Sequence, residues 1–298
     1  MFTTLVSGLS FTECPRWHEG RLYFSDYFNH RVLAITPEGT MEVVAHVPRR
    51  PAGLGFLPDG TLLIAAMTER RVLRLAQRGE LIEYADLSAL APGYINDMLV
   101  DHEGRAWVGN FGFDLYGGEP ARTTALICIE PDGRPRIAAD GLGFPNGMVI
   151  TPDGTFIVAE TMMNRLSAFT LRGGELGNRR TWAAFGPEPT ASDVGSLLSQ
   201  ADVVPDGICL DAEGAVWVAD ITHARMLRVA EGGVILRELK LPREDDEQLL
   251  PFGCMLGGED GRTLFVCAAP SYDEVECAAH HRACVLSARV DGARAGLP

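Results

Sequence analysis

The sequence has no run of about 18 apolar residues, which a membrane-spanning helix would need. It is also short of positive charge, with 26 lysine and arginine residues against 40 aspartates and glutamates and a formal net charge of −14. A chain this acidic repels phosphate backbones, so we expect neither a membrane nor a nucleic acid as its partner. Residues 1–5 lack a basic segment and a long apolar core. We therefore expect no secretory signal and a cytoplasmic location.

Two catalytic signatures are missing as well. The chain has no Gly-x-Ser-x-Gly segment of serine hydrolases and no phosphate-cradling Walker loop.

Its seven cysteines are odd in number and scattered, which indicates reduced thiols rather than a disulfide framework. The segment 277–284 combines two cysteines with two histidines. It could bind zinc or be structural, and its spacing matches no common zinc motif.

Glycine, by contrast, is abundant, with 33 residues in 298 and no Gly-x-y period of the collagen kind. Six acidic residue–glycine pairs recur at intervals of 40 to 60 residues. Each precedes a short run rich in β-branched and aromatic residues, as expected of a strand that leaves a hairpin turn. This repeat length is typical of β-propeller blades. The six glycines are Gly20, Gly60, Gly104, Gly154, Gly214 and Gly261.

A second glycine follows each of the six, so each repeat contains two hairpins and four strands. In the fourth repeat the predicted strands are 147–151, 155–160, 165–171 and 180–185. No helical pattern alternates with the strands, which disfavours a parallel α/β fold. The sequence therefore predicts an all-β, six-bladed propeller that spans residues 1–298 as a single domain. The sixth blade lacks its outer strand, and we expect residues 2–6 to close it rather than to form a loose tail.

The first strand of each blade should line the central channel, and one residue at its start should point into the channel mouth. Four of these six ring positions carry an oxygen donor, and two of the four are carboxylates. Such a ring suits a hard divalent cation such as calcium or magnesium. The alternative is that the Asn-Gly and Asp-Gly pairs only form turns at the blade junctions. Aligning the six repeats gives Glu13, Ala52, Asn96, Asn146, Asp206 and Phe252 as the ring positions.

Three segments at these positions, 13–17, 144–148 and 205–209, resemble motifs of the senescence-marker-protein/gluconolactonase/luciferin-regenerating-enzyme family of hydrolases. The resemblance extends from about residue 8 to residue 290. It implies a six-bladed propeller with one catalytic divalent ion in the channel. Calcium is the expected ion, and zinc, manganese or magnesium are alternatives.

The resemblance also implies roles for individual residues. Glu13, Asn146 and Asp206 match the family's metal ligands, and Asp206 also matches its general base or nucleophile. Asn96 matches a position that is a fourth ligand in some members and a contact to substrate or water in others. Two residues depart from the pattern, since Cys14 replaces a glycine and Tyr94 stands where some sugar lactonases carry an arginine. The second departure argues against a sugar lactone as substrate.

Two long loops follow the second strands of the third and sixth repeats, and a long connection runs over 186–204. All three should lie on the same face as the ring, because that is where second strands end. Long loops in a compact fold often form functional rims. We expect Phe111, Phe113 and Tyr116 to form an apolar rim, with Tyr94 and Phe113 close to the substrate. His223 is a second acid–base group or only a rim residue.

Taken together, these patterns predict a metal-dependent hydrolase that opens a lactone, in which the ion polarises the carbonyl and Asp206 is the general base. The expected partner is a small lactone or ester. A phosphotriester hydrolase on the same metal site is one alternative. A non-catalytic binding propeller stabilised by calcium is the other.

Overall fold

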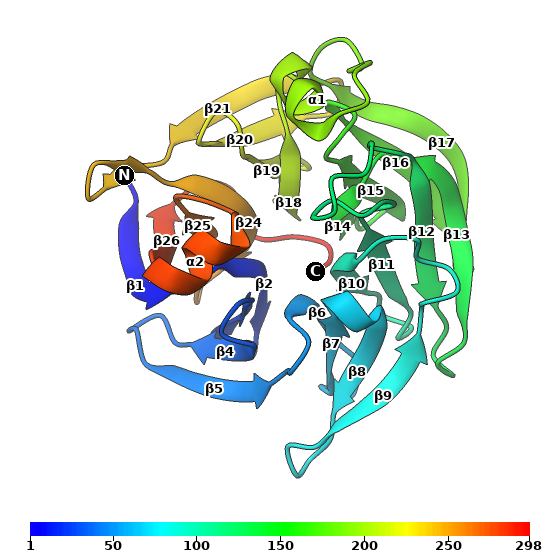
Figure 1. The fold of residues 1–298 in the computed structure, drawn as a ribbon, viewed down its shortest axis with the longest axis horizontal. Coiled ribbons are helices and arrows are strands. Elements are labelled where there is room, and N and C mark those ends of the chain that lie inside the picture. The colour runs from blue at the N-terminus through cyan, green and yellow to red at the C-terminus, as the bar shows by residue number, and fades with distance from the viewer.

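The structure, a computed structural model, describes residues 1–298 as a ring of six four-stranded antiparallel sheets around a central axis (Figure 1). In the first five blades the strands follow one another outward from the axis in chain order. In the sixth blade the N-terminal strand supplies the outer edge, in the order β24-β25-β26-β1. The predicted all-β propeller and its closure by the N-terminal strand are therefore confirmed.

The first three blades run from β2 to β13. Blade one contains β2 (Thr12–His18), β3 (Arg21–Asp26), β4 (Arg31–Ile35) and β5 (Met41–His46). Blade two contains β6 (Pro51–Phe56), β7 (Leu62–Ala66), β8 (Arg71–Leu75) and β9 (Leu81–Asp86). Blade three contains β10 (Ile95–Val100), β11 (Ala106–Asn110), β12 (Thr124–Ile129) and β13 (Pro135–Leu142).

The remaining blades run from β14 to β26 and include β1. Blade four contains β14 (Pro145–Ile150), β15 (Thr155–Glu160), β16 (Arg165–Arg172) and β17 (Glu175–Ala184). The first three lie within two residues of the predicted bounds, whereas β17 begins five residues earlier than predicted. Blade five contains β18 (Pro205–Leu210), β19 (Val216–Asp220), β20 (Arg225–Ala230) and β21 (Val234–Lys240). Blade six contains β24 (Leu250–Gly257), β25 (Thr263–Ala269), β26 (Ala283–Arg289) and β1 (Thr3–Leu9). A small hairpin, β22 (Arg243–Glu244) and β23 (Glu247–Gln248), precedes it.

The turn glycines explain the regular spacing of the blades. The six glycines that open the first hairpins all adopt φ values between +69° and +84°. Glycine reaches this left-handed region without the steric penalty that a side chain would impose. The turns therefore require glycine at the positions from which the repeat was counted.

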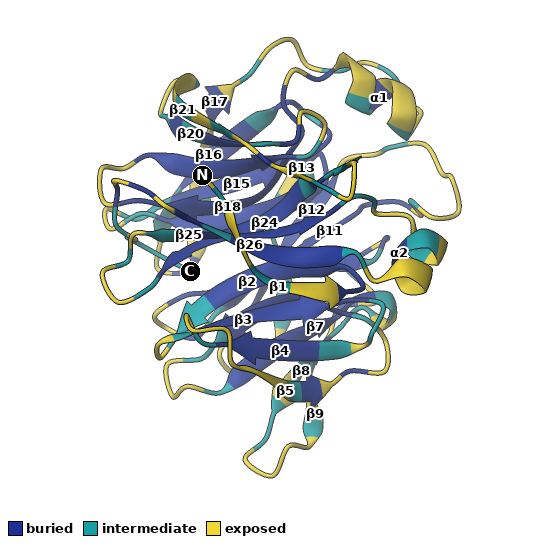
Figure 2. Cartoon of the chain, turned by 90° about the vertical axis from the view of Figure 1, so that its left-hand side faces the viewer, coloured by how far each residue is buried: buried dark blue, intermediate teal, exposed yellow.

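Burial falls from the axis to the rim (Figure 2). Every residue of the inner strands β10, β14 and β18 is buried, because neighbouring blades cover both of their faces. The outer strands β5 and β9 are mostly exposed. The outer strands therefore meet water most, and the buried inner strands can carry functional side chains at their ends.

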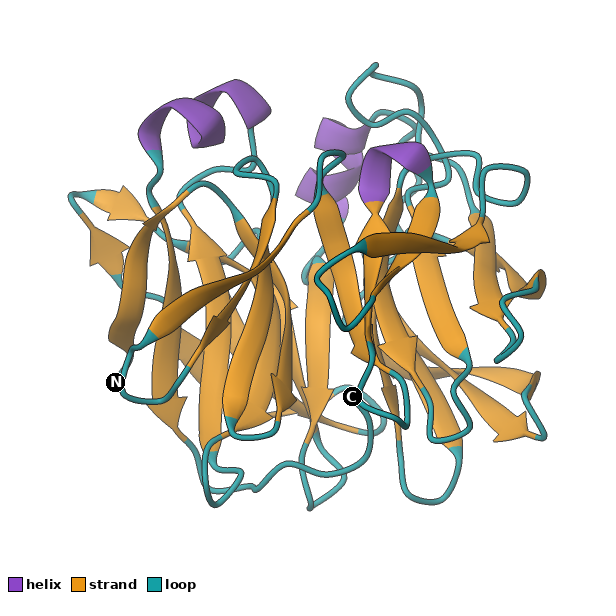
Figure 3. Cartoon of the chain, turned by 90° about the horizontal axis from the view of Figure 1, so that it is seen from below, coloured by secondary structure: helices purple, strands orange, loops and turns teal.

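Short helices occupy the loops on one face of the ring (Figure 3). They are η1 (Met67–Glu69), α1 (Val194–Gln200) and α2 (Glu274–His280). Helices α1 and α2 lie in segments that were expected to be loops. Asp193 and Asp273 cap them by accepting hydrogen bonds from backbone N–H groups, which explains where each helix begins. None of these helices has the length and apolar character to cross a membrane.

The C-terminal segment covers the opposite end of the channel. Leu297 pairs with Ile150 and Arg294 pairs with Asp211 through isolated bridges. Ile150 and Asp211 lie at the far ends of inner strands, away from the ring positions. The chain therefore ends near the axis (Figure 1), on the face that lies opposite the helices.

Candidate metal centre and substrate pocket

The four oxygen-bearing ring positions converge on one pocket. Glu13 lies in β2, Asn96 in β10, Asn146 in β14 and Asp206 in β18, near the start of each inner strand. All four line the same cavity of about 120 Å³ and are only 4–6% exposed. Phe252, the ring position of blade six, lines this cavity too.

Glycines next to the ring positions allow the inner strands to approach closely. A Cβ atom on Gly147 would lie 2.5 Å from the backbone nitrogen of Ile208, and one on Gly207 would lie 2.6 Å from the Cα of Gly253. No real side chain tolerates such contacts. These glycines follow Asn146 and Asp206 because a larger residue would force the two ring positions apart.

Hydrogen bonds hold the ring residues in place. Asn146 donates through Nδ2 to Oγ1 of Thr161 at 3.2 Å, and that hydroxyl donates to the carbonyl of Pro205 at 2.8 Å. Glu13 accepts through Oε2 from the backbone N–H of Cys14 at 2.7 Å. In contrast, Oδ1 of Asp206 is buried without any hydrogen-bond partner. An unpaired carboxylate oxygen in a polar ring is the expected feature of a cation ligand.

The charges buried along the channel also fit a divalent cation. Beneath the ring, Arg16 donates through Nη2 to Oδ1 of Asp97 at 2.6 Å, and both side chains are about 5% exposed. Three carboxylates, those of Glu13, Asp97 and Asp206, therefore share the channel with one guanidinium. When all four groups are ionised, the remaining charge of −2 is the charge that a divalent ion would neutralise.

The same surroundings disfavour charge on the bare ring. Burial, together with the nearby Asp97 carboxylate, raises the pKa of Glu13 to about 8. Burial, together with Glu13, raises the pKa of Asp206 well above its ordinary value. In the metal-free chain, ionisation of one carboxyl therefore makes ionisation of the other less favourable, as expected for like charges in a dry site.

A repeated latch anchors three of the blades just outside the ring. In blades one, four and five, the second strand ends in an acid that pairs with an arginine five residues later. Each acid also accepts a hydrogen bond from a backbone N–H in the segment that leads into the inner strand, at 2.9–3.1 Å. The pairs are Asp26 with Arg31, Glu160 with Arg165 and Asp220 with Arg225. Sequence reasoning missed the latch, although the acid–arginine spacing of five residues is visible in the sequence.

A second ring of side chains lies above the first. In five blades, the residue directly after the second strand lines the pocket. These residues are Tyr27, Met67, Phe111, Thr161 and Ile221. Sequence reasoning identified only Phe111 among them, although counting one residue past each second strand would have found all five.

Loops and helix α1 supply most of the remaining wall. Leu115 and Tyr116 come from the blade-three loop, Val194 and Leu198 from α1, and Tyr272 from the blade-six loop. Residues from all three long loops thus line the pocket, in agreement with the expectation that these loops surround its mouth.

Three residues expected near the substrate lie outside this pocket. Tyr94 packs behind Phe111 and Tyr116, with ring centroids 6.1 and 6.0 Å away, and with Phe113 it lines a separate cleft. Phe113 is fully buried, because its side chain packs in the hydrophobic core instead of at the mouth. The ring of His223 is half exposed, and its Nδ1 lies 3.2 Å from Oδ2 of Asp220 in the blade-five latch.

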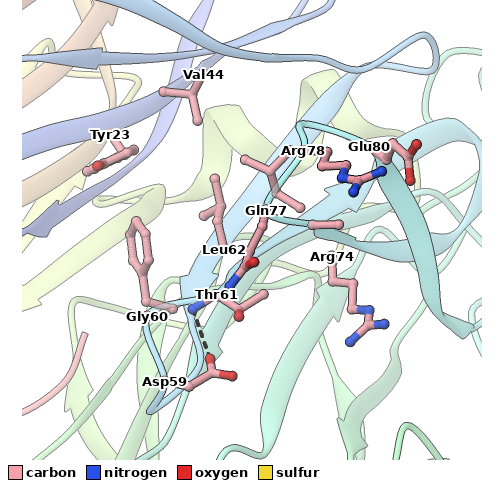
Figure 4. Close-up of a pocket in the computed structure, with 13 residues that line it drawn as sticks. Tyr23, Val44, Asp59, Gly60, Thr61, Leu62, Arg74, Gln77, Arg78 and Glu80 are labelled. Atoms are coloured by element: carbon pink, nitrogen blue, oxygen red, sulfur yellow. Dashed lines mark hydrogen bonds between the residues drawn. The ribbon is translucent and has the colours of Figure 1, made fainter.

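Other features of the chain lie away from the ring. A larger, open groove lies between blades one and two, bordered by Tyr23, Asp59 and Arg74 (Figure 4). The segment 277–284 forms part of α2 and β26, and no cluster of three or more His, Cys, Asp or Glu side chains with the arrangement of a metal site occurs in the structure. All seven cysteines are free and buried.

Fold and site together define a class: six-bladed propellers with a buried ring of carboxylate and amide oxygens at one end of the channel. A sequence profile described as the SMP-30/Gluconolactonase/LRE-like region matches residues 11–270. The match covers most of the chain, which therefore belongs to this family.

Individual relatives agree with this assignment. The 6-deoxy-6-sulfogluconolactonase of Pseudomonas putida is 26% identical over 288 residues, covering 94% of this chain and 91% of that protein. A pentonolactonase of Haloferax volcanii is 28% identical over 262 residues, covering 86% and 81%. Among solved structures, a luciferin-regenerating enzyme superimposes with a TM-score of 0.79 at 17% identity, covering 100% and 98% of the two chains. A calcium-binding regucalcin from Agrobacterium tumefaciens gives 0.77 at 18% identity, covering 100% and 97%.

Proposed function

We propose that this protein is a hydrolase that opens lactone rings with the help of one bound divalent cation. The observation that carries the proposal is the buried ring with two carboxyl groups, in which one oxygen of Asp206 has no partner. The ring forms the floor of a cavity of small-molecule size. Two relatives that are named as lactonases support the choice of reaction.

Glu13, Asn146 and Asp206 would hold the cation, and all three would bind it through oxygen. Such donors suit calcium, magnesium or manganese better than they suit zinc, which more often takes nitrogen or sulfur ligands. We favour calcium, because a solved structure with this fold is described as calcium-binding. Asn96 would be a fourth ligand or a substrate contact, and its Oδ1 accepts a long hydrogen bond of 3.5 Å from the Tyr27 hydroxyl.

In the proposed reaction, a water molecule attacks the carbonyl carbon of the lactone, and Asp206 takes one of its protons on the carboxylate oxygen that does not bind the cation. The bond between the carbonyl carbon and the ring oxygen then breaks, and the ring oxygen receives that proton. The product is a single hydroxy acid, and water is the only co-reactant. When bound, a divalent cation would polarise the carbonyl and stabilise the negative charge that develops on its oxygen.

A variant at Asp206 tests the proposal. In Asp206→Asn the proton acceptor and one ligand charge are lost, so hydrolysis of a lactone panel should fall at least ~100-fold. Proton release with and without chelator measures the rate, and calorimetry measures calcium binding. Asp202→Asn is the matched control, because Asp202 is exposed and lies four residues away. An Asp206→Asn protein that keeps both its cation and its full rate would refute the base assignment.

The same assay separates the two alternatives. Chelator-sensitive turnover of a phosphotriester with no turnover of any lactone would favour a phosphotriesterase. If calcium raises the melting temperature while lactones and phosphotriesters stay unchanged, the cation has a structural role.

A further inference from the structure

The walls above the ring are almost entirely apolar. In the second ring, Met67, Phe111 and Ile221 face the cavity with hydrocarbon, sulfur or an aromatic ring, and only Tyr27 and Thr161 carry a hydroxyl. Both hydroxyls are already engaged, that of Tyr27 with Asn96 and that of Thr161 with the carbonyl of Pro205. Apart from the hydroxyls of Tyr116 and Tyr272 at the rim, the polar groups of the pocket are thus concentrated at the floor.

Basic side chains are absent from the cavity lining. The arginine that comes near the mouth is Arg50, which forms an ion pair with Glu274 and lies 5.7 Å from the ring centroid of Tyr116. A sugar lactone buried here would exchange hydrogen bonds to water for contacts with hydrocarbon, which is unfavourable for each hydroxyl left unpaired. A sulfonate or phosphate on the substrate would find no counter-charge in the lining.

An apolar path leads from the ring toward solvent. Half-buried Val194 and Leu198 of α1 line one side, and the partly exposed rings of Tyr116 and Tyr272 stand at the rim. A backbone hydrogen bond connects two parts of this wall, since the N–H of Ala121 donates to the carbonyl of Ser192 at 2.8 Å. This contact joins the blade-three loop to the segment that leads into α1, so the apolar surface is built into the fold.

The size of the cavity limits what lies deep inside. Its volume of about 120 Å³ is slightly below the ~150 Å³ of an engineered apolar cavity that binds benzene. One five- or six-membered lactone ring would fill it. Any substituent must then extend along the apolar path past Leu198 and between the rim tyrosines.

We propose that the substrate is a lactone whose ring carries a hydrocarbon chain, with the ester carbonyl at the oxygen ring and the chain on the apolar wall. This assignment rests on the proposed hydrolase function and names its substrate class. The reaction is unchanged: water adds to the carbonyl carbon, the ring C–O bond breaks and the ring oxygen takes the proton.

The substrate series that tests the proposal consists of γ-valerolactone, γ-heptalactone, γ-nonalactone and glucono-δ-lactone with the calcium-loaded protein. Each buried methylene contributes ~0.8 kcal/mol, so kcat/KM should rise about fourfold per methylene until the chain leaves the wall. We expect γ-nonalactone to exceed γ-valerolactone at least tenfold and to exceed glucono-δ-lactone as well. A preference for the sugar lactone, or no dependence on chain length, would overturn the substrate class while leaving the hydrolase function intact.

A wall variant locates the chain. Leu198→Asp places a charge on the apolar path and should reduce the preference for γ-nonalactone over γ-valerolactone to less than threefold. Val275→Asp is the matched control, because Val275 is an exposed residue of α2 outside the cavity lining and its change should leave the preference unaltered. Melting curves verify that both variants fold. If either variant does not fold, the substrate series on the wild-type protein still tests the proposal. An unaltered preference in a folded Leu198→Asp protein would contradict the proposed path.

A binding measurement separates this inference from the proposed function. Lactams of the same ring size and substituents cannot be hydrolysed readily, and calorimetry gives their affinities. If no lactone is turned over, the hydrolase function fails. A pentyl lactam that binds at least tenfold tighter than the methyl lactam would still support the apolar ligand class, and equal binding would overturn it.

Discussion

The latch of blade four allows a stability prediction with a definite sign and size. Glu160 is fully buried, and its carboxylate accepts hydrogen bonds from Arg165 at 2.8 Å, Arg179 at 3.0 Å and the backbone N–H of Gly143 at 2.9 Å. Ser167 donates to it as well. In Glu160→Gln the charge is lost and an amide N–H₂ group meets these donors.

Breaking a buried ion pair by changing one partner costs about 3–5 kcal/mol. The side chains of Arg165 and Arg179 are 21% and 33% exposed, so water can partly solvate them in the variant. We therefore expect the lower end, about 3 kcal/mol at pH 7. For a chain of 298 residues, with an unfolding entropy of about 2.1 cal/mol/K per residue, that corresponds to a fall in melting temperature of roughly 5 °C.

The effect should depend on pH in one direction. Burial alone would raise the pKa of Glu160, but the hydrogen bonds from Arg165, Ser167 and Gly143 outweigh it and lower the pKa. A lowered carboxyl pKa stabilises the fold at pH values above the unfolded pKa of about 4.3. This stabilisation is lost as the pH falls through the folded pKa. The difference between wild type and Glu160→Gln should therefore narrow below about pH 4.

Urea denaturation at pH 7 and at steps down to pH 3.5 measures the difference. Glu231→Gln is the control, because Glu231 and its partner Arg180 are both well exposed and the pair should contribute less than ~1 kcal/mol. The reasoning would be refuted if Glu160→Gln lost less than 1 kcal/mol at pH 7. It would also be refuted if the difference stayed constant over the whole pH range.

Two further predictions concern the ring itself. Calcium at one hundred times its dissociation constant should stabilise the wild type by about 2.7 kcal/mol, and Glu13→Gln should lose most of this gain; equal gains in both proteins would remove Glu13 from the ligand set. Gly147→Ala should destabilise the fold by about 1–3 kcal/mol and weaken calcium binding, because the added methyl would meet the backbone of Ile208. Gly177→Ala is its control, since a Cβ there has no neighbour within 4 Å; similar losses in the two variants would show that crowding at the inner strands is not the cause.

Much of the site was predictable because it follows the phase of the repeat. Once the turn glycines are aligned, Asn96, Asn146 and Asp206 fall at the same position of their blades, and a propeller brings equivalent positions to one axis. The structure gathers these residues in one pocket. The second ring has the same periodicity. Thr161 and Ile221 were not predicted because positions were counted only at the start of the first strand of each blade and not at the end of the second strand.

Other parts of the site could not be read from the repeat. Phe111 and Phe113 stand two residues apart in one loop, and only the path of the backbone sends the first into the pocket and the second into the core. The pair between Arg16 and Asp97 joins blades one and three across the channel. No local pattern indicates a contact between residues so distant in the chain.

The sequence by itself determined the number of blades, their four strands, the closure by the N-terminal strand and the phase of the ring. These follow from local chemistry, since turn glycines and strand-forming runs act within a few residues. The tertiary structure alone decided which side chains form the apolar wall of the cavity, which charged groups share the channel and where the C-terminal segment lies over its far end. Those properties arise from side chains that different blades and loops bring together, and their contacts exist only once the ring has closed.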